Sequence, residues 1–389
     1  VSYNDMGTSG DARSQSRISD HELVSALERR GKVTVYEKPF NQFTTGRSNR
    51  TDLKERIFFC RVEKNTKKIP SRIKSEHNSH SPSFIKSPLN YTGGKHKLLP
   101  QISEYWPKDI ETFYDIFCGA ANVGINANAK KIICLDKSLR VIEVLRLIQS
   151  SNFEELHQDI MAVVEKYGLS QSYVNGYEHY NAESTSGLGS YNKEPYIKLR
   201  EAYNKCTDTN KPLLLLVLIL YGFNNQIRFN SKMEFNLPVG KRDYNGSSRR
   251  NLANFNSITN DKNITFVEGD FRDLLTTKLS VNDFVYLDPP YLLGLASYNE
   301  SNGWNESDEL NLYEVLTTLN TRGIRFALSN VIEHKGEVNN ILTKWVKENG
   351  FTINYINHSY KNSNYQTTAK HAVTKEVLVT NYKLKPKRK

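Results

Sequence analysis

The sequence predicts an α/β protein with a mostly parallel sheet that is interrupted by one long insertion. Short apolar runs of β-branched and aromatic residues recur from residue 84 onward, and helical patterns separate several of them. Alternation of buried strands with helices is typical of parallel α/β sheets. The segment 151–261, between the second and third runs, is too long for an ordinary crossover and is rich in Asn, Tyr, Ser, Arg and Lys. We therefore expect an inserted domain or a large functional loop there.

The expected strands and helices divide the chain into four parts. Strands are expected at Tyr114–Cys118, Lys131–Leu135, Ile264–Val267, Asp283–Leu287, Ile324–Leu328 and Lys375–Asn381. Helices are expected at Ser138–Gln149 and Glu309–Asn320. The first part of the sheet domain then occupies 84–150, the insertion 151–261 and the second part of the sheet domain 262–389.

Residues 1–83 form a basic N-terminal extension of unknown role. Their 16 Lys and Arg minus 10 Asp and Glu leave +6 of the formal charge of +11. A Ser-x-x-Glu capping box predicts a short helix at Ser19–Arg30, and apolar clusters predict strands at Val33–Tyr36 and Ile57–Val62. The stretch 64–83 has the composition of a linker or basic arm. A small DNA-contacting module and a poorly ordered extension both remain open.

Composition excludes several classes of protein. The longest apolar run, Pro212–Tyr221, is too short to cross a bilayer, and the polar start of the chain lacks a signal pattern, so we expect a soluble, cytoplasmic protein. The four cysteines lie far apart without a CxxC pair, which favours reduced thiols and no metal site. The charge of +11 and pI of about 9.2 favour a polyanionic partner, although a merely basic soluble protein would show the same values.

Polar residues and glycines follow three successive expected strands. Asp115 and Gly119 lie at the first, Asp136 ends the second, and Asp270 follows the third. Carboxyl ends of parallel strands meet at one edge of the sheet, where a glycine permits close backbone approach and a carboxylate accepts hydrogen bonds from ribose hydroxyls. Each feature alone is also a common turn or helix cap. Together they predict a nucleoside cofactor, while GxxxxGK[ST] and GxGxxG phosphate motifs are absent.

The stretch Tyr91-Thr-Gly-Gly-Lys95 precedes the first of these strands. It is either a simple turn or a place where a lysine and a flat ring lie beside a charged ligand. The two glycines would allow the close packing that the second interpretation needs.

The chemistry of the chain is indicated most strongly by Asp288-Pro-Pro-Tyr291, which ends the run FVYL. An exocyclic amine on a base is a poor nucleophile, and a carboxylate with a backbone carbonyl accepting from its N–H groups would offset the charge that develops during attack. Asp288 supplies the carboxylate, and Pro289 and Pro290 hold a rigid turn without N–H donors. Tyr291 offers a stacking face for a base flipped out of a duplex. The plainer interpretation is a proline-rich turn capped by Asp288.

With these three motifs in this order, the chain resembles the Dam-type family of S-adenosylmethionine-dependent DNA adenine methyltransferases, from about Phe84 to Tyr382. The resemblance implies a Rossmann-like methyltransferase fold with an inserted, mainly helical target-recognition domain carrying a β-hairpin. It also implies S-adenosyl-L-methionine as the cofactor. The cofactor-binding residues would be Tyr91, Lys95, Asp115, Phe117, Gly119, Asp136, Asp270 and Asp288.

The resemblance extends to a DNA-reading hairpin within 221–240. By it, Phe223 would intercalate beside the flipped base, Asn224 would hold the orphaned partner, and Arg228 would read a guanine, which suits guanidinium geometry. Gln226 and Pro238 complete the expected DNA-binding set. The chain departs from the family pattern at Ala121 in the cofactor loop, where the family has a glycine. It also departs at Asn90, where many members have a base-reading lysine, and at Gln226, where some have leucine; with these two changes the resemblance does not predict whether GATC is the target.

The leading hypothesis is a site-specific adenine methyltransferase that acts on double-stranded DNA. Such an enzyme would belong to a restriction-modification system, with a cognate endonuclease as its partner, or it would be an orphan or phage enzyme. Alternatives are methylation of the cytosine exocyclic amine or of adenine in RNA, and a non-catalytic DNA-binding subunit with the same fold. The sequence contains no Pro-Cys nucleophile motif, so methylation of the C5 carbon of cytosine is not expected.

Overall fold

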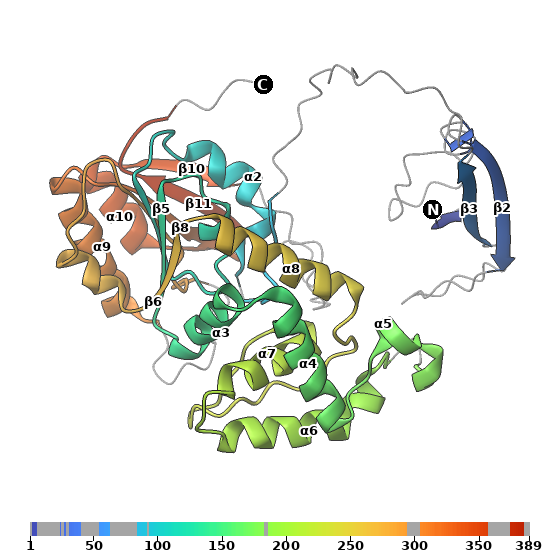
Figure 1. Cartoon of the computed structure of the whole chain (residues 1–389). Coiled ribbons are helices and arrows are strands. Elements are labelled where there is room, and N and C mark those ends of the chain that lie inside the picture. Colours follow the sequence, from blue (N-terminus) through green and yellow to red (C-terminus); the bar gives the residue numbers. More distant parts are fainter. Residues whose placement is uncertain are drawn as a thin grey trace. The chain divides into compact units, whose positions relative to one another are not determined.

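A computed structural model describes residues 2–5, 24, 27–28, 31–39, 54–62, 84–91, 93–182, 186–293, 304–356 and 374–384 (Figure 1). The described residues divide into two compact units. One contains three N-terminal strands, and the other contains everything described from Phe84 onward. The predicted arm at 64–83 lies outside the described residues.

The N-terminal unit contains one antiparallel sheet. Its strands are β1 (Ser2–Asp5), β2 (Gly31–Pro39) and β3 (Lys54–Val62), in the order β1-β3-β2. The two strands predicted in this part lie within β2 and β3. Of the helix predicted at Ser19–Arg30, only Val24, Leu27 and Glu28 are described, and these are helical.

The second unit is built on an eight-stranded sheet whose centre is parallel, as predicted. The order is β10-β11-β8-β7-β4-β5-β6, with the two-residue β9 beside β8. Pairs from β8 to β6 are parallel, whereas β11 runs antiparallel to β8 and β10 antiparallel to β11. The strands are β4 (Thr112–Ile116), β5 (Lys131–Asp136), β6 (Ile264–Glu268), β7 (Phe284–Leu287), β8 (Arg325–His334), β9 (Glu337–Val338), β10 (Thr352–Ile356) and β11 (Thr374–Thr380).

Helices cover both faces of this sheet. On one face, α3 (Leu139–Ser150) and α8 (Gly246–Asp261) share a core with Phe113 and Cys134 of the sheet. On the other, α9 (Glu306–Thr321) and α10 (Asn340–Asn349) pack with Tyr114 and Val285. Figure 1 shows α9 and α10 side by side in orange. Along the chain, β5 and β6 are added on one side of β4, and β7 and β8 are then added on its other side. The point between β4 and β7 is therefore a topological switch point, where ligands bind in open α/β sheets.

The segment between β5 and β6 is mainly helical. It contains α3, α4 (Phe153–Tyr167), α5 (Ser172–Asn175), α6 (Gly189–Lys205), α7 (Lys211–Tyr221) and α8. The apolar run found in the sequence forms α7, which starts with Pro212 in its first turn and is fully buried from Leu215 to Tyr221. It is buried on all sides because α3, α4 and α6 contact it. The remaining short helices are α2 (Leu99–Ile102), η1 (Lys95–Lys97), η2 (Ser103–Tyr105), η3 (Gly124–Asn126), η4 (Glu178–Tyr180), η5 (Phe223–Asn225) and η6 (Phe271–Leu275).

Residues 222–240 fold back on themselves between α7 and α8. Isolated antiparallel bridges join Gly222 to Val239 and Phe229 to Phe235. At the base, Gly240 donates its N–H to Tyr221 O at 2.8 Å, and Phe223 donates to Pro238 O at 2.9 Å. We call residues 222–240 the hairpin segment. Within the described residues, no helix is long and apolar enough to span a membrane.

Candidate active site

Asp288 stands at the carboxyl end of β7, next to the end of β4. Its N–H donates to Ile116 O of β4 at 3.3 Å, which fixes the backbone where the two central strands separate. The carboxylate is close to two donors: Lys95 Nζ lies 2.9 Å from Oδ1, and the Tyr291 hydroxyl donates to Oδ1 at 3.0 Å. The side chain retains 18% exposure, so it is reachable from outside. Pro289 and Pro290 lie in the turn between Asp288 and Tyr291, and the Tyr291 hydroxyl contacts the Asp288 carboxylate.

Lys95 brings the glycine-rich loop to this carboxylate. It opens η1 directly after Gly93 and Gly94, is 4% exposed, and donates from Nζ to Gly93 O at 2.8 Å. Nζ also lies 5.1 Å from the centre of the Tyr291 ring. Burial alone would lower the pKa of Lys95, but the neighbouring carboxylates of Asp288 and Glu376 outweigh it and raise the pKa above its usual value. The lysine is therefore a permanent cation in a buried place.

Glu376 of β11 is the member of this cluster that the sequence did not reveal. Its Oε1 lies 3.5 Å from Lys95 Nζ and 3.2 Å from the Tyr291 hydroxyl, and the residue is 4% exposed. Burial raises the pKa of Asp288, Lys95 lowers it, and Glu376 raises it again. A carboxylate directly before the apolar residues 377–379 of β11 was a usable signal, because buried glutamates are rare unless paired.

The loop after β4 carries the second group of predicted residues. Asp115 is 1% exposed and accepts the N–H of Gly124, the first residue of η3, at 2.8 Å. Burial raises the pKa of Asp115 to about 8, against the opposing effect of the Gly124 N–H. Phe117 and Ala121 both adopt left-handed backbone conformations, with φ of 61° and 56°. Such conformations are costly for residues other than glycine and recur at functional sites.

Gly119 contacts two other predicted residues, Asp136 and Tyr91. Its N–H donates to Asp136 Oδ2 at 2.9 Å, and Asp136 Oδ1 accepts from Ser138 N at 2.9 Å. A Cβ added at Gly119 would lie 3.1 Å from Cγ of Tyr91, so the ring of Tyr91 packs on the glycine. The structure thus brings Tyr91, Gly119 and Asp136 together at the ends of β4 and β5.

Three aromatic rings gather beside this loop. Phe117, Phe271 and Trp304 have ring centres 5.5 to 5.9 Å apart. Trp304, which the sequence analysis did not single out, donates from Nε1 to the buried Glu309 at 2.6 Å. Asp270 caps η6 and accepts hydrogen bonds from the backbone N–H and the guanidinium of Arg272. Its carboxylate therefore stabilises the start of η6, after the end of β6.

The base of the hairpin segment is docked on the residue before Tyr91. Asn90 donates its backbone N–H to Asn225 O at 3.1 Å and its side-chain amide to Asn224 O at 2.8 Å, and it forms a parallel bridge with Gln226. Asn224 and Asn225 allow this because both adopt left-handed conformations that Asn tolerates. The predicted cofactor loop and the predicted DNA-reading residues are thus one connected structure.

The outer residues of the hairpin segment are exposed. Phe223 is 42% exposed, an unusual state for a large ring. Arg228 donates from Nε to Asn236 Oδ1 at 2.8 Å and from Nη2 to Asn236 O at 2.7 Å, which fixes the guanidinium of this exposed residue. Pro238 is exposed on the opposite arm.

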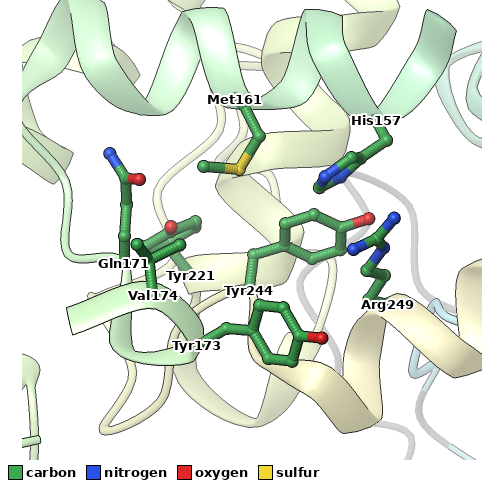
Figure 2. A pocket seen from close by; sticks show the side chains of 8 residues that line it. All are labelled: His157, Met161, Gln171, Tyr173, Val174, Tyr221, Tyr244 and Arg249. Carbon is green, nitrogen blue, oxygen red and sulfur yellow. The ribbon is translucent and has the colours of Figure 1, made fainter. Parts of the chain in front are cut away.

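A separate pocket of about 180 Å³ lies among the helices (Figure 2). Its walls come from α4, α5, the end of α7 and the start of α8, and Figure 2 shows the Tyr244 hydroxyl directed toward the ends of His157 and Arg249. Tyr244 OH and His157 Nδ1 are buried without a hydrogen-bond partner in the described part of the chain. None of the residues predicted for chemistry lines this pocket, so the candidate active site is the edge of the sheet around Asp288. The lining residues are His157, Met161, Gln171, Tyr173, Val174, Tyr221, Tyr244 and Arg249.

The chain is similar in sequence to several known proteins. Type II methyltransferase M.FokI of Planomicrobium okeanokoites is 38% identical over 383 residues, which cover 95% of this chain and 55% of the relative. Modification methylase StsI of Streptococcus sanguinis is 36% identical over 397 residues, or 99% of this chain and 56% of the relative. A DNA adenine methylase of Salmonella typhi is 26% identical over 247 residues, or 62% and 79%.

The chain spans a little over half the length of the first two relatives. The model of the D12 class N6 adenine-specific DNA methyltransferases matches residues 91–364, from the ring packed on Gly119 to beyond the turn that follows β7. With these identities, that match shows that the chain belongs to the family of D12 class N6 adenine-specific DNA methyltransferases.

Proposed function

We propose that this chain transfers a methyl group from S-adenosyl-L-methionine to the exocyclic amine of an adenine flipped out of double-stranded DNA. The observation that carries the proposal is the placement of Asp288 at the end of β7, where Lys95 and Tyr291 hold one carboxylate oxygen. A carboxylate fixed in this way accepts an N–H of the target amine and stabilises the positive charge that grows on nitrogen during attack. Pro289 and Pro290 keep N–H donors out of the turn, so backbone carbonyls remain as further acceptors.

The residues at the edge of the sheet fit the cofactor. The buried cluster holds two carboxylates and one ammonium group, and Asp115 adds a third buried carboxyl group, which suits a ligand with a sulfonium and an amino group. Asp136 offers lone pairs for ribose hydroxyls, and Phe117 provides an apolar wall. When bound, the cofactor supplies an electrophilic methyl group. The cofactor-binding set proposed is Tyr91, Lys95, Asp115, Phe117, Gly119, Asp136, Asp270 and Asp288.

The helical segment 151–261 with its hairpin segment is proposed as the inserted target-recognition domain. The exposed Phe223 is suited to entering the space that a flipped base vacates, and Asn224 lies next to it. Arg228, oriented by Asn236, is suited to reading a guanine edge. Gln226 and Pro238 flank these positions. Residues 84–150 and 262–389 would be the two parts of the catalytic domain.

We further propose that the enzyme is the modification partner of a restriction system, with an endonuclease acting on the same site. The proposal rests on the relatives, whose names describe a type II methyltransferase and a modification methylase.

The test is transfer of labelled methyl groups from S-adenosyl-L-methionine to unmethylated DNA, followed by sequence-resolved mapping of the modified bases. We expect label on the adenine exocyclic amine at one recurring sequence. Asp288→Ala should abolish transfer, because the acceptor for the amine is lost. It should weaken cofactor binding, measured by calorimetry, only a few-fold, because the seven other residues of the proposed cofactor-binding set remain.

Asp159→Ala is the matched control, since Asp159 is exposed on α4 and far along the chain from the site. It should methylate DNA like the wild type. Label on cytosine, or transfer at the full rate by Asp288→Ala, would refute the proposed function.

A further inference from the structure

Arg228 and Asn236 lie opposite each other on the two arms of the hairpin segment. Phe229 and Phe235 form an antiparallel bridge, so Arg228 and Asn236 are the next pair along the arms. Asn236 donates its backbone N–H to Arg228 O at 3.1 Å. Its side-chain oxygen and its carbonyl accept from the guanidinium at 2.8 and 2.7 Å. Three hydrogen bonds therefore join one exposed arginine to a single residue across the hairpin segment.

The two neighbours of Asn236 anchor it to the helical segment. Phe235 and Leu237 are 1% and 2% exposed, so both side chains are held in the core. Asn204 of α6 accepts from Phe235 N at 2.9 Å and donates to Phe235 O at 3.2 Å. Asn236 is thus fixed from behind by α6 and presents its acceptors to Arg228.

The shape of the guanidinium decides which donors remain for DNA. A guanidinium carries five N–H groups in a planar fork, and Asn236 takes the one on Nε and one on Nη2. Within the described residues, the Arg228 guanidinium makes no other hydrogen bond. The N–H groups left on Nη1 and Nη2 form a parallel pair, which matches O6 and N7 of guanine.

Holding an arginine before DNA arrives favours discrimination between base pairs. An unrestrained arginine loses rotamer freedom when it binds a base, and this loss reduces the gain from the correct pair. It can also turn to phosphates, which carry no sequence information. A guanidinium held in one orientation avoids both effects, so the matched base pair gains more than a mismatched one.

We propose that Asn236 is a specificity-determining residue, which positions the Arg228 guanidinium for one base pair without reading a base itself. The inference rests on the proposed function, in which Arg228 reads a guanine. Asn204 supports the same arrangement, because it fixes the backbone of Phe235 beside Asn236.

The test measures discrimination in DNA binding, which needs no methyl transfer. The wild-type chain selects duplexes from a randomised pool in the presence of S-adenosyl-L-homocysteine, which cannot donate a methyl group. The ratio of affinities for the selected duplex and for duplexes changed at one base pair then measures discrimination. Arg228→Ala identifies the pair that Arg228 reads, because the ratio there should fall by about 5- to 150-fold.

Asn236→Ala should lower the ratio at the same base pair by about 3- to 10-fold, since the arginine must now be ordered on binding. The ratios at other base pairs and the melting temperature should stay near wild type. Adding Asn236→Ala to Arg228→Ala should cause no further loss, because Asn236 acts through the arginine. Asn236→Asp keeps an acceptor for the Nε–H group and should retain most of the wild-type ratio.

Asn230→Ala is the matched control. Asn230 lies in the same segment, and its side chain makes hydrogen bonds to Glu234 and to the backbone of Lys232, not to Arg228. The variant should leave the ratio at the Arg228 base pair unchanged.

An unchanged ratio in Asn236→Ala would overturn the inference. Losses that add in the double variant would do the same, because Asn236 would then contact the DNA independently of Arg228. An equal loss in Asn230→Ala would also overturn it, since loosening of the whole segment would explain the effect. Each of these results leaves the proposed methyl transfer intact. A wild-type chain that does not methylate DNA adenine overturns the proposed function, whereas the binding ratios still decide the role of Asn236.

Discussion

Asp115 is the residue whose ionisation most clearly opposes folding. Its pKa rises from 3.8 to about 8 because the carboxyl group is buried. The folded state therefore binds more protons than the unfolded state between these values, and stability falls as the pH rises from about 4 to about 8. We predict that Asp115→Asn is more stable than the wild type at pH 8, by up to a few kcal/mol. Asn can still accept the Gly124 N–H.

Thermal unfolding without cofactor at pH 8 and near pH 4 measures this effect. The advantage of Asp115→Asn should be much smaller near pH 4, where the wild-type carboxyl group is protonated in the folded state and about half protonated in the unfolded state. An advantage that does not depend on pH would show that packing, and not ionisation, separates the two proteins. S-adenosyl-L-methionine should bind the variant more weakly, because a carboxylate that can ionise beside a cationic ligand has been removed.

At the same scale, the sequence revealed the residues of the site that stand in compact motifs. Lys95, Asp288 and Tyr291 were predicted, and the structure places them within hydrogen-bond or ring contact of one another. Glu376 escaped because it joins from β11, 85 residues beyond Tyr291. Asn90 was noted only as a departure from the family pattern, and its hydrogen bonds to the hairpin segment require the fold.

At the scale of elements, the backbones of the two arms of the hairpin segment approach closely at Gly222 and Gly240. A Cβ added at Gly240 would lie 2.5 Å from Gly222 O and 3.2 Å from Phe223 N. Both neighbours are backbone atoms, so no side chain can move aside. We predict that Gly240→Ala separates the arms, costs about 1–3 kcal/mol of stability and weakens sequence discrimination, because Phe223 and Pro238 lose their spacing.

Chemical unfolding and methylation of matched and mismatched DNA test this prediction. Gly350→Ala is the control, because Gly350 has a φ of 67° but nothing within 4 Å of an added Cβ. It should show only the modest cost of a left-handed alanine and unchanged discrimination. Equal stability and discrimination of the two variants would mean that the close approach of Gly222 and Gly240 tolerates a methyl group.

The elements themselves were largely predictable, and their arrangement was less so. Buried apolar runs indicated β4 to β8 and β11, because strands covered on both faces need continuous apolar sequence. The same runs do not reveal direction, so the antiparallel pairing of β11 with β8 and β10 was not foreseen. The hairpin segment came from the family resemblance alone, since its short, irregular bridges leave little periodicity to read.

At the scale of the whole molecule, the formal charge is unevenly distributed along the chain. Among the described residues, the apolar core of the second unit is built from side chains between Phe84 and Tyr382. Residues 1–83 nevertheless carry +6 of the +11 formal charge, and their removal leaves +5. We predict that deleting 1–83 leaves the melting transition of the second unit within a few degrees of that in the full chain. DNA binding should weaken, most of all at low salt.

The reason is that cations placed near phosphates gain affinity by releasing counterions, and this gain falls as salt rises. Binding to one DNA duplex across a salt series measures it: the plot of log affinity against log salt should be shallower for the shortened chain. A charge-free version of the extension, with its lysines and arginines changed to glutamine and its aspartates and glutamates changed to asparagine and glutamine, should behave like the deletion. Equal slopes for the full and shortened chains would show that the extension stays away from DNA and that the cations from residue 84 onward supply the attraction alone.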